Sequence, residues 1–265
     1  MIIHNLDPIF IDLGFIQVRW YSLSYIAGII IGLIYAKKII TSLGKKNFNY
    51  NLKPAVMDNL ISYLIIGIIL GGRLGYVLFY NLSYFINNPI KIFYIWEGGM
   101  SFHGGIIGTA IFIFLFCRKN NIDLFLISDI IACAAPIGIF FGRLANFING
   151  ELYGKITNLP WGVIFPNAGG YPRHPSQIYE ATLEGLLLFL IMYFLFIKKK
   201  WIFKTGIATS FFLIFYSIFR LISEYFREPD PQLGYIFYSF SLGSILSIIT
   251  FLIGLIIYFK KLNEK

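Results

Sequence analysis

Long apolar runs recur along this chain, and seven of them have about the length needed to cross a bilayer. A membrane helix needs about 20 mostly apolar residues to span the hydrocarbon layer. The runs occupy residues 20–40, 59–80, 93–116, 124–141, 177–197, 205–223 and 238–258. The third is interrupted by glycines and by His103. The pattern predicts an all-α integral membrane protein of about seven transmembrane helices.

Lysine and arginine are distributed unevenly among the segments that connect these runs. Fourteen of the 22 basic residues follow the first, third and fifth runs or lie in the tail: Lys37, Lys38, Lys45, Lys46, Lys53, Arg118, Lys119, Lys198, Lys199, Lys200, Lys204, Lys260, Lys261 and Lys265. By the positive-inside rule these segments are cytoplasmic. We therefore expect an outer amino terminus, a cytoplasmic carboxyl terminus and one polytopic membrane domain over residues 1–265.

Composition agrees with a membrane protein. Only 13% of the residues are charged and 57% are hydrophobic, whereas a soluble domain carries about 25% charged residues. The net charge of +9 does not indicate nucleic-acid binding, because the basic residues are confined to short connecting segments. Cys117 and Cys133 lack metal-ligand spacing and are predicted to be buried thiols, so neither a metal nor a cofactor is expected.

The longest outer segment, residues 143–176, is rich in glycine, proline and asparagine. These residues favour turns. We expect a small folded extracytoplasmic cap between the fourth and fifth spans.

Three arginines share a position in the predicted topology. Arg73, Arg143 and Arg220 lie near the outer ends of spans two, four and six, on the side that disfavours basic residues. Each alone could pair with a helix end and extend to the headgroups. Together they predict a cationic pocket, since guanidinium forks bind phosphate through paired hydrogen bonds.

Two Gly-Gly pairs bracket His103 at membrane depth, in the segment GGMSFHGG at 98–105. Irregular backbone at this depth is tolerated only against protein or a water-filled cavity. Histidine is the usual general base near neutral pH, so we interpret His103 as a catalytic base. The alternative is a histidine hydrogen-bonded within the helix bundle.

Further polar residues gather where the fourth span meets the cap. Asn146, Asn149 and Glu151 accompany Arg143 within ten residues, and the amides could donate to phosphate or glycerol oxygens. Glu180 and Glu184 are four residues apart on the fifth span, for which structural pairing is the favoured interpretation. Glu224 follows Arg220 by four residues, so these two are expected to form an internal ion pair.

All of these residues except Glu184 fall in five segments that resemble the bacterial prolipoprotein diacylglyceryl transferases. The segments are LGGRLGYVLFYN at 70–81, GGMSFHGG at 98–105, GRLANFINGELYG at 142–154, PRHPSQIYE at 172–180 and RLISEYFREPD at 220–230. They occur in the family's order and cover most of the chain.

The resemblance implies an activity at the bacterial inner membrane. The family transfers the diacylglyceryl group of phosphatidylglycerol to the lipobox cysteine of a preprolipoprotein signal peptide, forming a thioether and releasing glycerol phosphate. Its partners are therefore phosphatidylglycerol, that peptide and the lipid bilayer. Carried over by position, His103 and Arg220 are catalytic, whereas Arg143 binds the lipid phosphate. Other expected substrate-binding positions are Arg73, Tyr21, Asn146, Glu151, Gly154 and Glu224.

Three other classes of protein agree less well with the sequence. A transporter of anionic solutes uses broken helices at the bilayer midplane, whereas the polar residues here cluster at one face. An intramembrane serine protease needs a Gly-x-Ser-Gly nucleophile, which this sequence lacks. A non-catalytic lipid-binding scaffold is disfavoured only by the family resemblance.

Overall fold

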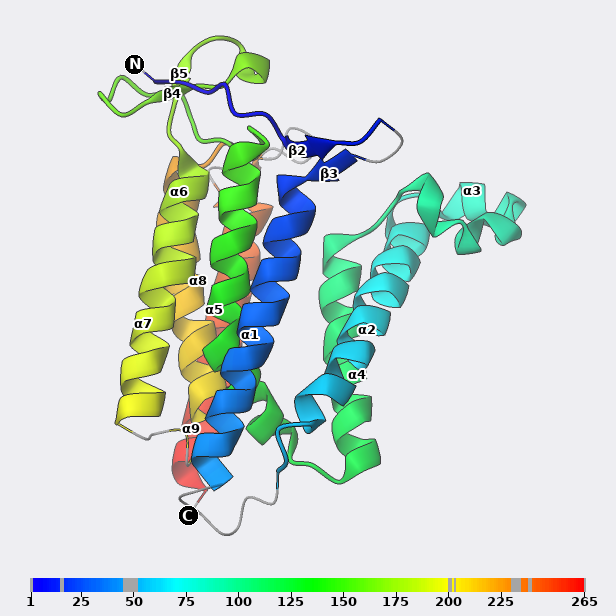
Figure 1. The fold of residues 1–265 in the computed structure, drawn as a ribbon, viewed down its shortest axis with the longest axis vertical. Coiled ribbons are helices and arrows are strands. Elements are labelled where there is room, and N and C mark those ends of the chain that lie inside the picture. The colour runs from blue at the N-terminus through cyan, green and yellow to red at the C-terminus, as the bar shows by residue number, and fades with distance from the viewer. Residues whose placement is uncertain are drawn as a thin grey trace. The chain divides into compact units, whose positions relative to one another are not determined.

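The computed structural model describes residues 2–14, 17–44, 52–199, 202, 204–229, 235–237 and 240–264. They are mostly helical. They form two compact units, the first from Met1–Ile39 and Ser128–Lys265, the second from Ile40–Ile127. Figure 1 labels the elements of both units, which are described separately below.

Six helices of the described part are long and apolar enough to cross a membrane. They are α1 (Trp20–Gly44), α2 (Val56–Phe79), α5 (Leu124–Ile148), the continuous helix Ser176–Lys198, α8 (Ile207–Phe226) and α9 (Leu242–Asn263). Six of the seven predicted spans therefore correspond to membrane-length helices. Both cysteines are buried in helices, as predicted.

The third predicted span, 93–116, begins too early. Its helix, α4 (Phe102–Asn120), is preceded by two 3-10 turns, η1 (Pro89–Phe93) and η2 (Ile95–Glu97). Gly98 and Gly99 have φ angles of 84° and 82°, which a right-handed helix cannot contain. Ser101 then caps α4 by accepting a hydrogen bond of 3.1 Å from the Gly104 amide.

Helix α5 extends beyond the predicted end at residue 141. It continues to Ile148, because Ala145, Phe147 and Ile148 prolong the apolar pattern and the first turn-forming glycine is Gly150, with φ of 64°. The first residues of the expected cap, including Arg143, are therefore helical. This places their side chains on a rigid element.

Residues 149–175 form the non-helical segment between α5 and α6. It contains β4 (Val163–Ile164), η3 (Pro166–Ala168) and β5 (Pro172–Arg173). Strand β4 pairs antiparallel with β5 and parallel with the amino-terminal strand β1 (Ile2–Ile3). Val163, Phe165 and Ala168 of this segment form a small apolar core that packs against Phe147 and Tyr153.

The helix Ser176–Lys198 is not a regular α-helix. It alternates between α6 (Ser176–Glu180), the π-helix η4 (Ala181–Leu187), α7 (Leu188–Met192) and the π-helix η5 (Tyr193–Lys198). π-Helical turns are rare and are frequently found at functional sites. Here the first π turn follows Glu180 and contains Glu184.

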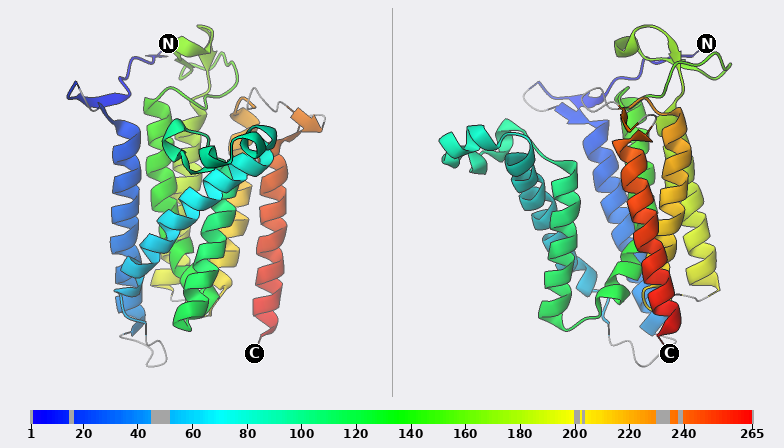
Figure 2. Two further views of the ribbon diagram at one scale, coloured as in Figure 1. Left: turned by 90° about the vertical axis from the view of Figure 1, so that its right-hand side faces the viewer. Right: turned by 180° about the vertical axis from the view of Figure 1, so that it is seen from behind.

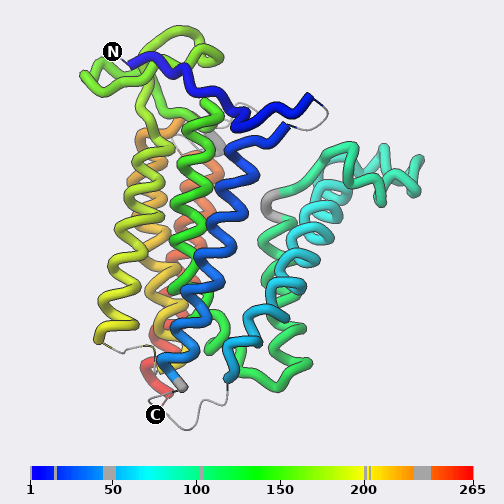
Figure 3. The backbone as a smooth tube through the Cα atoms, viewed as in Figure 1, coloured from blue at the N-terminus to red at the C-terminus, as the bar shows by residue number. Residues whose placement is uncertain are grey.

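The helices of the first unit run side by side, and α1 and α9 point in the same direction (Figures 1 and 2). Strand β1 lies at the end of this unit that carries β4 and β5, and the carboxyl end of α9 lies at the opposite end (Figure 3). Two short hairpins complete the unit. They pair β2 (Ile9–Asp12) with β3 (Gln17–Arg19), and β6 (Tyr235–Phe237) with β7 (Phe240–Ser241).

The second unit is built on glycine contacts between α2 and α4. Gly67, Gly71 and Gly75 of α2 face Gly104 and Gly108 of α4, and a Cβ atom at Gly71 would overlap the Gly104 carbonyl oxygen. Small residues at this spacing let helix backbones approach closely in a membrane. The short helix α3 (Leu82–Asn87) and the turns η1 and η2 connect the two helices.

Candidate active site

Arg143 of α5 lies where the first unit holds most of its buried charge. Its Nη1 is 2.8 Å from Oε2 of Glu180, and its Nη2 is 3.4 Å from Oε2 of Glu184. Both carboxylates come from the helix that follows the cap. The guanidinium fork therefore spans two carboxylates one turn apart, an orientation that a lysine ammonium could not reproduce.

Arg220 of α8 reaches the same carboxylates from another side. Its Nη1 is 2.9 Å from Oε1 of Glu180 and 3.6 Å from Oε1 of Glu184. Its Nη2 is 2.7 Å from Oε2 of Glu224, which confirms the predicted ion pair. The hydroxyl of Ser241 donates to Oε1 of Glu224 at 2.7 Å. This hydrogen bond connects the ion pairs to the start of α9.

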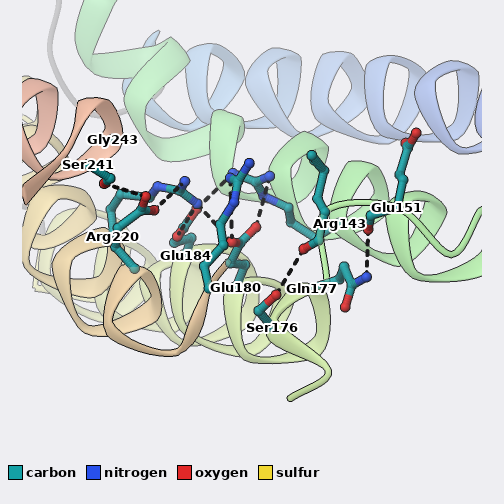
Figure 4. Close-up of polar contacts among 12 residues, drawn as sticks. Arg143, Glu151, Ser176, Gln177, Glu180, Glu184, Arg220, Ser241 and Gly243 are labelled. Atoms are coloured by element: carbon teal, nitrogen blue, oxygen red, sulfur yellow. Dashed lines mark hydrogen bonds and ion pairs between the residues drawn. The ribbon is translucent and has the colours of Figure 1, made fainter. Parts of the chain in front are cut away.

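Glu180 is the centre of this arrangement (Figure 4). It is fully buried, and its two oxygens face Arg143 and Arg220 separately. Arg227, at the end of α8, places its Nη1 3.9 Å from Glu180 Oε1. Three arginines thus offset three glutamates, counting Glu184 and Glu224. We call these six residues the Arg–Glu cluster.

Local backbone features let the cluster assemble. A Cβ atom at Gly185 would lie 2.7 Å from the Cβ of Phe140, so this glycine lets the helix with Glu180 approach α5 one turn from Arg143. A Cβ at Gly243 would lie 2.7 Å from a carboxylate oxygen of Glu224. Glycine is required at 185, where backbone atoms of Phe140 lie close, whereas a Cβ at 243 would displace the carboxylate of Glu224.

A second polar group, of neutral and acidic side chains, lies beside the cluster. The amide of Asn146 donates to Oε1 of Glu151 at 2.7 Å, and Tyr21 of α1 interacts with both residues. The Tyr21 hydroxyl is also 3.0 Å from that of Tyr25. Gln177 joins this group to the helix of Glu180 by donating to the Glu151 carbonyl oxygen at 2.6 Å. Three of the predicted positions are therefore brought together.

Gly154 lies where the cap meets the end of α8. Its amide donates to the His174 carbonyl oxygen at 2.8 Å, and a Cβ atom here would lie 2.6 Å from the carbonyl oxygens of His174 and Phe226. Arg173 stabilises the same contact region. Its Nη1 donates to the Gly154 carbonyl oxygen at 3.2 Å and pairs with Oε2 of Glu228, also at 3.2 Å. The contacts of Gly154 are thus backbone packing contacts.

His174 lies just before α6 and contacts Tyr179 of that helix. Trp161 Nε1 donates to the Tyr179 hydroxyl at 2.8 Å, and that hydroxyl lies 3.1 Å from Nδ1 of His174. Burial lowers the pKa of His174, and nearby Lys155 lowers it further. A neutral His174 can therefore accept the Tyr179 hydrogen at Nδ1.

Arg73 belongs to the second unit and has partners other than those expected. Its Nε, Nη1 and Nη2 atoms donate to five main-chain carbonyls of the loop before α4, at Lys91, Ile92, Tyr94, Gly98 and Gly99. Its guanidinium also lies 5.1 Å from the Phe85 ring centroid. The residue is 5% exposed, and these contacts fix the shape of the loop.

The backbone of His103 belongs to the first turn of α4 in the second unit. Its side chain lies outside the part of the chain that the structure describes. Its role as a base stays a prediction.

Three residues of the cluster were not among the expected site residues. Glu180 and Glu184 form the structural pairs that the sequence favours, and no site role is predicted for Arg227. Arg220, Glu224 and Arg227 recur at spacings of four and three residues, which places them on one helix face. That spacing was the signal available for Arg227.

Comparison with known proteins gives a consistent result. The chain matches the family model described as prolipoprotein diacylglyceryl transferase over residues 8–260. A phosphatidylglycerol–prolipoprotein diacylglyceryl transferase of Rickettsia felis is 51% identical over 250 residues, covering 94% of this chain and 95% of the relative. A protein of the same name from Rickettsia bellii is 49% identical over 260 residues, covering 97% of this chain and 95% of the relative. Another from Rickettsia canadensis is 48% identical over 254 residues, covering 96% of this chain and 96% of the relative.

Proposed function

Since the chain belongs to the prolipoprotein diacylglyceryl transferase family, we infer that it is a membrane transferase that moves a diacylglyceryl group from phosphatidylglycerol to a prolipoprotein. The acceptor atom is the thiol sulfur of a lipobox cysteine in the signal peptide. The site for this reaction is the Arg–Glu cluster together with the neighbouring group of Tyr21, Asn146 and Glu151.

The reaction exchanges one bond for another at a glycerol carbon. The cysteine thiol loses its proton, the sulfur attacks the carbon that bears the phosphate ester, and a C–S thioether bond forms. The C–O bond breaks with its electron pair, and glycerol phosphate leaves. A free thiol has a pKa of about 8.5 and is mostly protonated at neutral pH. A base close to it therefore increases the fraction present as the nucleophilic thiolate. We assign this base to His103.

One observation carries the proposal: guanidinium groups of two different helices meet on the same buried carboxylate. Arg143 and Arg220 lie 2.8 and 2.9 Å from the two oxygens of Glu180. Glu180 thus holds two forks whose remaining N–H groups can donate to phosphate oxygens. In a site shielded from water such donors stabilise the charge that develops on the leaving phosphate. Arg143 would bind the phosphate, and Arg220 would stabilise the developing charge.

The other expected site residues take supporting roles. Tyr21, Asn146 and Glu151 offer hydroxyl, amide and carboxylate groups for the glycerol headgroup, and Glu224 orients Arg220 through their 2.7 Å contact. For Arg73 and Gly154 the geometry supports positioning, because their contacts are with the protein's own main chain.

We also propose the topology expected from the lysine distribution. Helix α4 adds a seventh span, the third in chain order, to the six membrane-length helices of one polytopic domain. The amino terminus and the cap are outside the inner membrane. The parallel directions of α1 and α9 in the first unit support termini on opposite sides (Figure 2).

The test is an assay with purified protein, phosphatidylglycerol and a synthetic lipobox peptide. Mass spectrometry measures the diacylglyceryl adduct on the cysteine, and a second assay measures released glycerol phosphate. We expect adduct with the wild type, and almost none with Arg143→Lys, which keeps the charge and loses the fork. Arg118→Ala removes an exposed arginine of α4 and is the matched control.

Two outcomes would contradict parts of the proposal. No adduct from the wild type, under conditions in which a Rickettsia relative is active, rejects the transferase function. Full activity of His103→Gln rejects His103 as the base and leaves the arginine site standing.

A further inference from the structure

A further buried carboxylate, outside the Arg–Glu cluster, lies near the start of α5. Asp129 is fully buried. Its Oδ2 accepts a hydrogen bond of 2.6 Å from the Gly206 amide, and its Oδ1 accepts from the amide and hydroxyl of Thr209 at 2.7 and 2.6 Å. All three donors belong to the start of α8. One side chain of α5 therefore holds the beginning of another helix.

Helix α8 depends on this contact because its own sequence provides no cap there. Gly206 is the cap residue, it has no side chain to accept a hydrogen bond, and its φ is 89°. The first amides of a helix need acceptors from elsewhere, and a carboxylate is favourable at this positive end. Asp129 supplies that acceptor while belonging to a different helix, so it both caps α8 and fixes α8 against α5.

The position of this contact relates it to the arginines. Fourteen residues separate Asp129 from Arg143, and 14 separate Gly206 from Arg220. In an α-helix 14 residues rise about 21 Å and return to nearly the same face. Helices α5 and α8 rise in the same direction from this contact (Figures 1 and 2). Because α5 and α8 each advance by the same distance from the Asp129 contact, Arg143 and Arg220 lie at the same level along the two helices. Both side chains reach Glu180 at that level.

We propose that Asp129 is a positioning residue that sets the register of α5 against α8 and thereby holds Arg143 and Arg220 at the same height on Glu180. This inference rests on the proposed function for the importance of that height. When Asp129 is lost, the start of α8 loses its acceptor, and α8 shifts along α5. The guanidinium of Arg220 then leaves its place beside that of Arg143.

The test compares the full-length variants Asp129→Ala, Asp129→Asn and Thr209→Val with Thr250→Val as control. Thr250 donates its hydroxyl to Leu246 within α9, so its loss removes a similar hydrogen bond without separating two helices. We expect kcat/KM of the folded fraction to fall about 10- to 100-fold in Asp129→Ala, since small misplacements of catalytic groups have effects of this size. Thr209→Val, which keeps two of the three hydrogen bonds, should lose less. The control should match the wild type.

A double-mutant cycle with Glu180→Gln separates positioning from general destabilisation. Sites this far apart normally have independent effects. If Asp129 acts through the arginines, the fold-decrease in kcat/KM of the double variant is clearly smaller than the product of the fold-decreases of the two single variants. Multiplicative losses, or Asp129→Asn and Thr209→Val with wild-type kcat/KM, would overturn the inference. A wild type without transferase activity would instead reject the proposed function.

Discussion

Replacing Glu180 by glutamine tests the central contact of the site. The change preserves size and removes one buried negative charge. Arg143 and Arg220 both lose an ion pair shorter than 3 Å, and the formal charge of the Arg–Glu cluster rises from zero to +1. Glu184→Gln is the matched comparison, because Glu184 is equally buried but lies 3.4 and 3.6 Å from the same arginines.

The distances set the expected magnitudes. Removing one partner of a buried ion pair costs about 3–5 kcal/mol. A glutamine oxygen still accepts a hydrogen bond from one arginine, and Glu184 still attracts both, so we expect Glu180→Gln to lower the free energy of unfolding by about 2 kcal/mol. For Glu184→Gln, with longer contacts, we expect about 1 kcal/mol.

The kinetic effect should exceed the loss of stability. With Glu180 neutral, the guanidinium groups of Arg143 and Arg220 lose the carboxylate that positions both of them. We therefore expect kcat to fall about 100-fold. The KM for phosphatidylglycerol should not rise, because the added positive charge favours an anionic headgroup. The assay measures adduct formation at varied lipid concentration, with thermal unfolding measured in parallel. A wild-type kcat for Glu180→Gln, or an equal loss for Glu184→Gln, would refute this reasoning.

Three other substitutions have definite expected results. Arg73→Gln should lower the free energy of unfolding by about 3 kcal/mol, because five main-chain carbonyls lose donors, and equal thermal unfolding of variant and wild type would contradict this. Gly154→Ala should abolish activity through backbone displacement, whereas Gly142→Ala, with no atom within 4 Å of the new Cβ, should remain active in the adduct assay. Gly243→Ala should push Glu224 away and reduce kcat without loss of folded protein, and an unchanged kcat would show that Glu224 does not orient its arginine.

The sequence predicted most of the spans because bilayer thickness constrains them directly. It missed the start of α4, where the apolar residues of η1 and η2 resemble helix in composition. The positive φ angles of Gly98 and Gly99 and the extended backbone of the cap residue Ser101 separate the turns from the helix. It also ended α5 early, because Arg143 and Asn146 interrupt an apolar pattern that Ala145, Phe147 and Ile148 continue.

The candidate site was predicted in part, and the limit was distance along the chain. The pair of Arg220 and Glu224 followed from helical spacing, and the structure confirms it. The meeting of Arg143 with Glu180 joins residues 37 positions apart, so no local pattern could reveal it. The partners of Arg73 were unpredictable for another reason: they are carbonyl groups, which every residue possesses.

The neutrality of the Arg–Glu cluster has a consequence for how the chain enters the bilayer during synthesis. A single buried charge in an isolated helix costs about 2.5–3.5 kcal/mol at the translocon. The helix Ser176–Lys198 carries Glu180 and Glu184, and α8 carries Arg220 with Glu224. As a hairpin these two helices hold three carboxylates against one arginine, so neutrality also requires Arg143 of α5 and Arg227. Pairing with these arginines before lipid surrounds the helices removes the cost. A glycosylation-mapping experiment should therefore show that the helix Ser176–Lys198 integrates more efficiently within segment 124–227, which contains the whole cluster, than alone, and equal efficiency would mean that the pairing forms only after insertion.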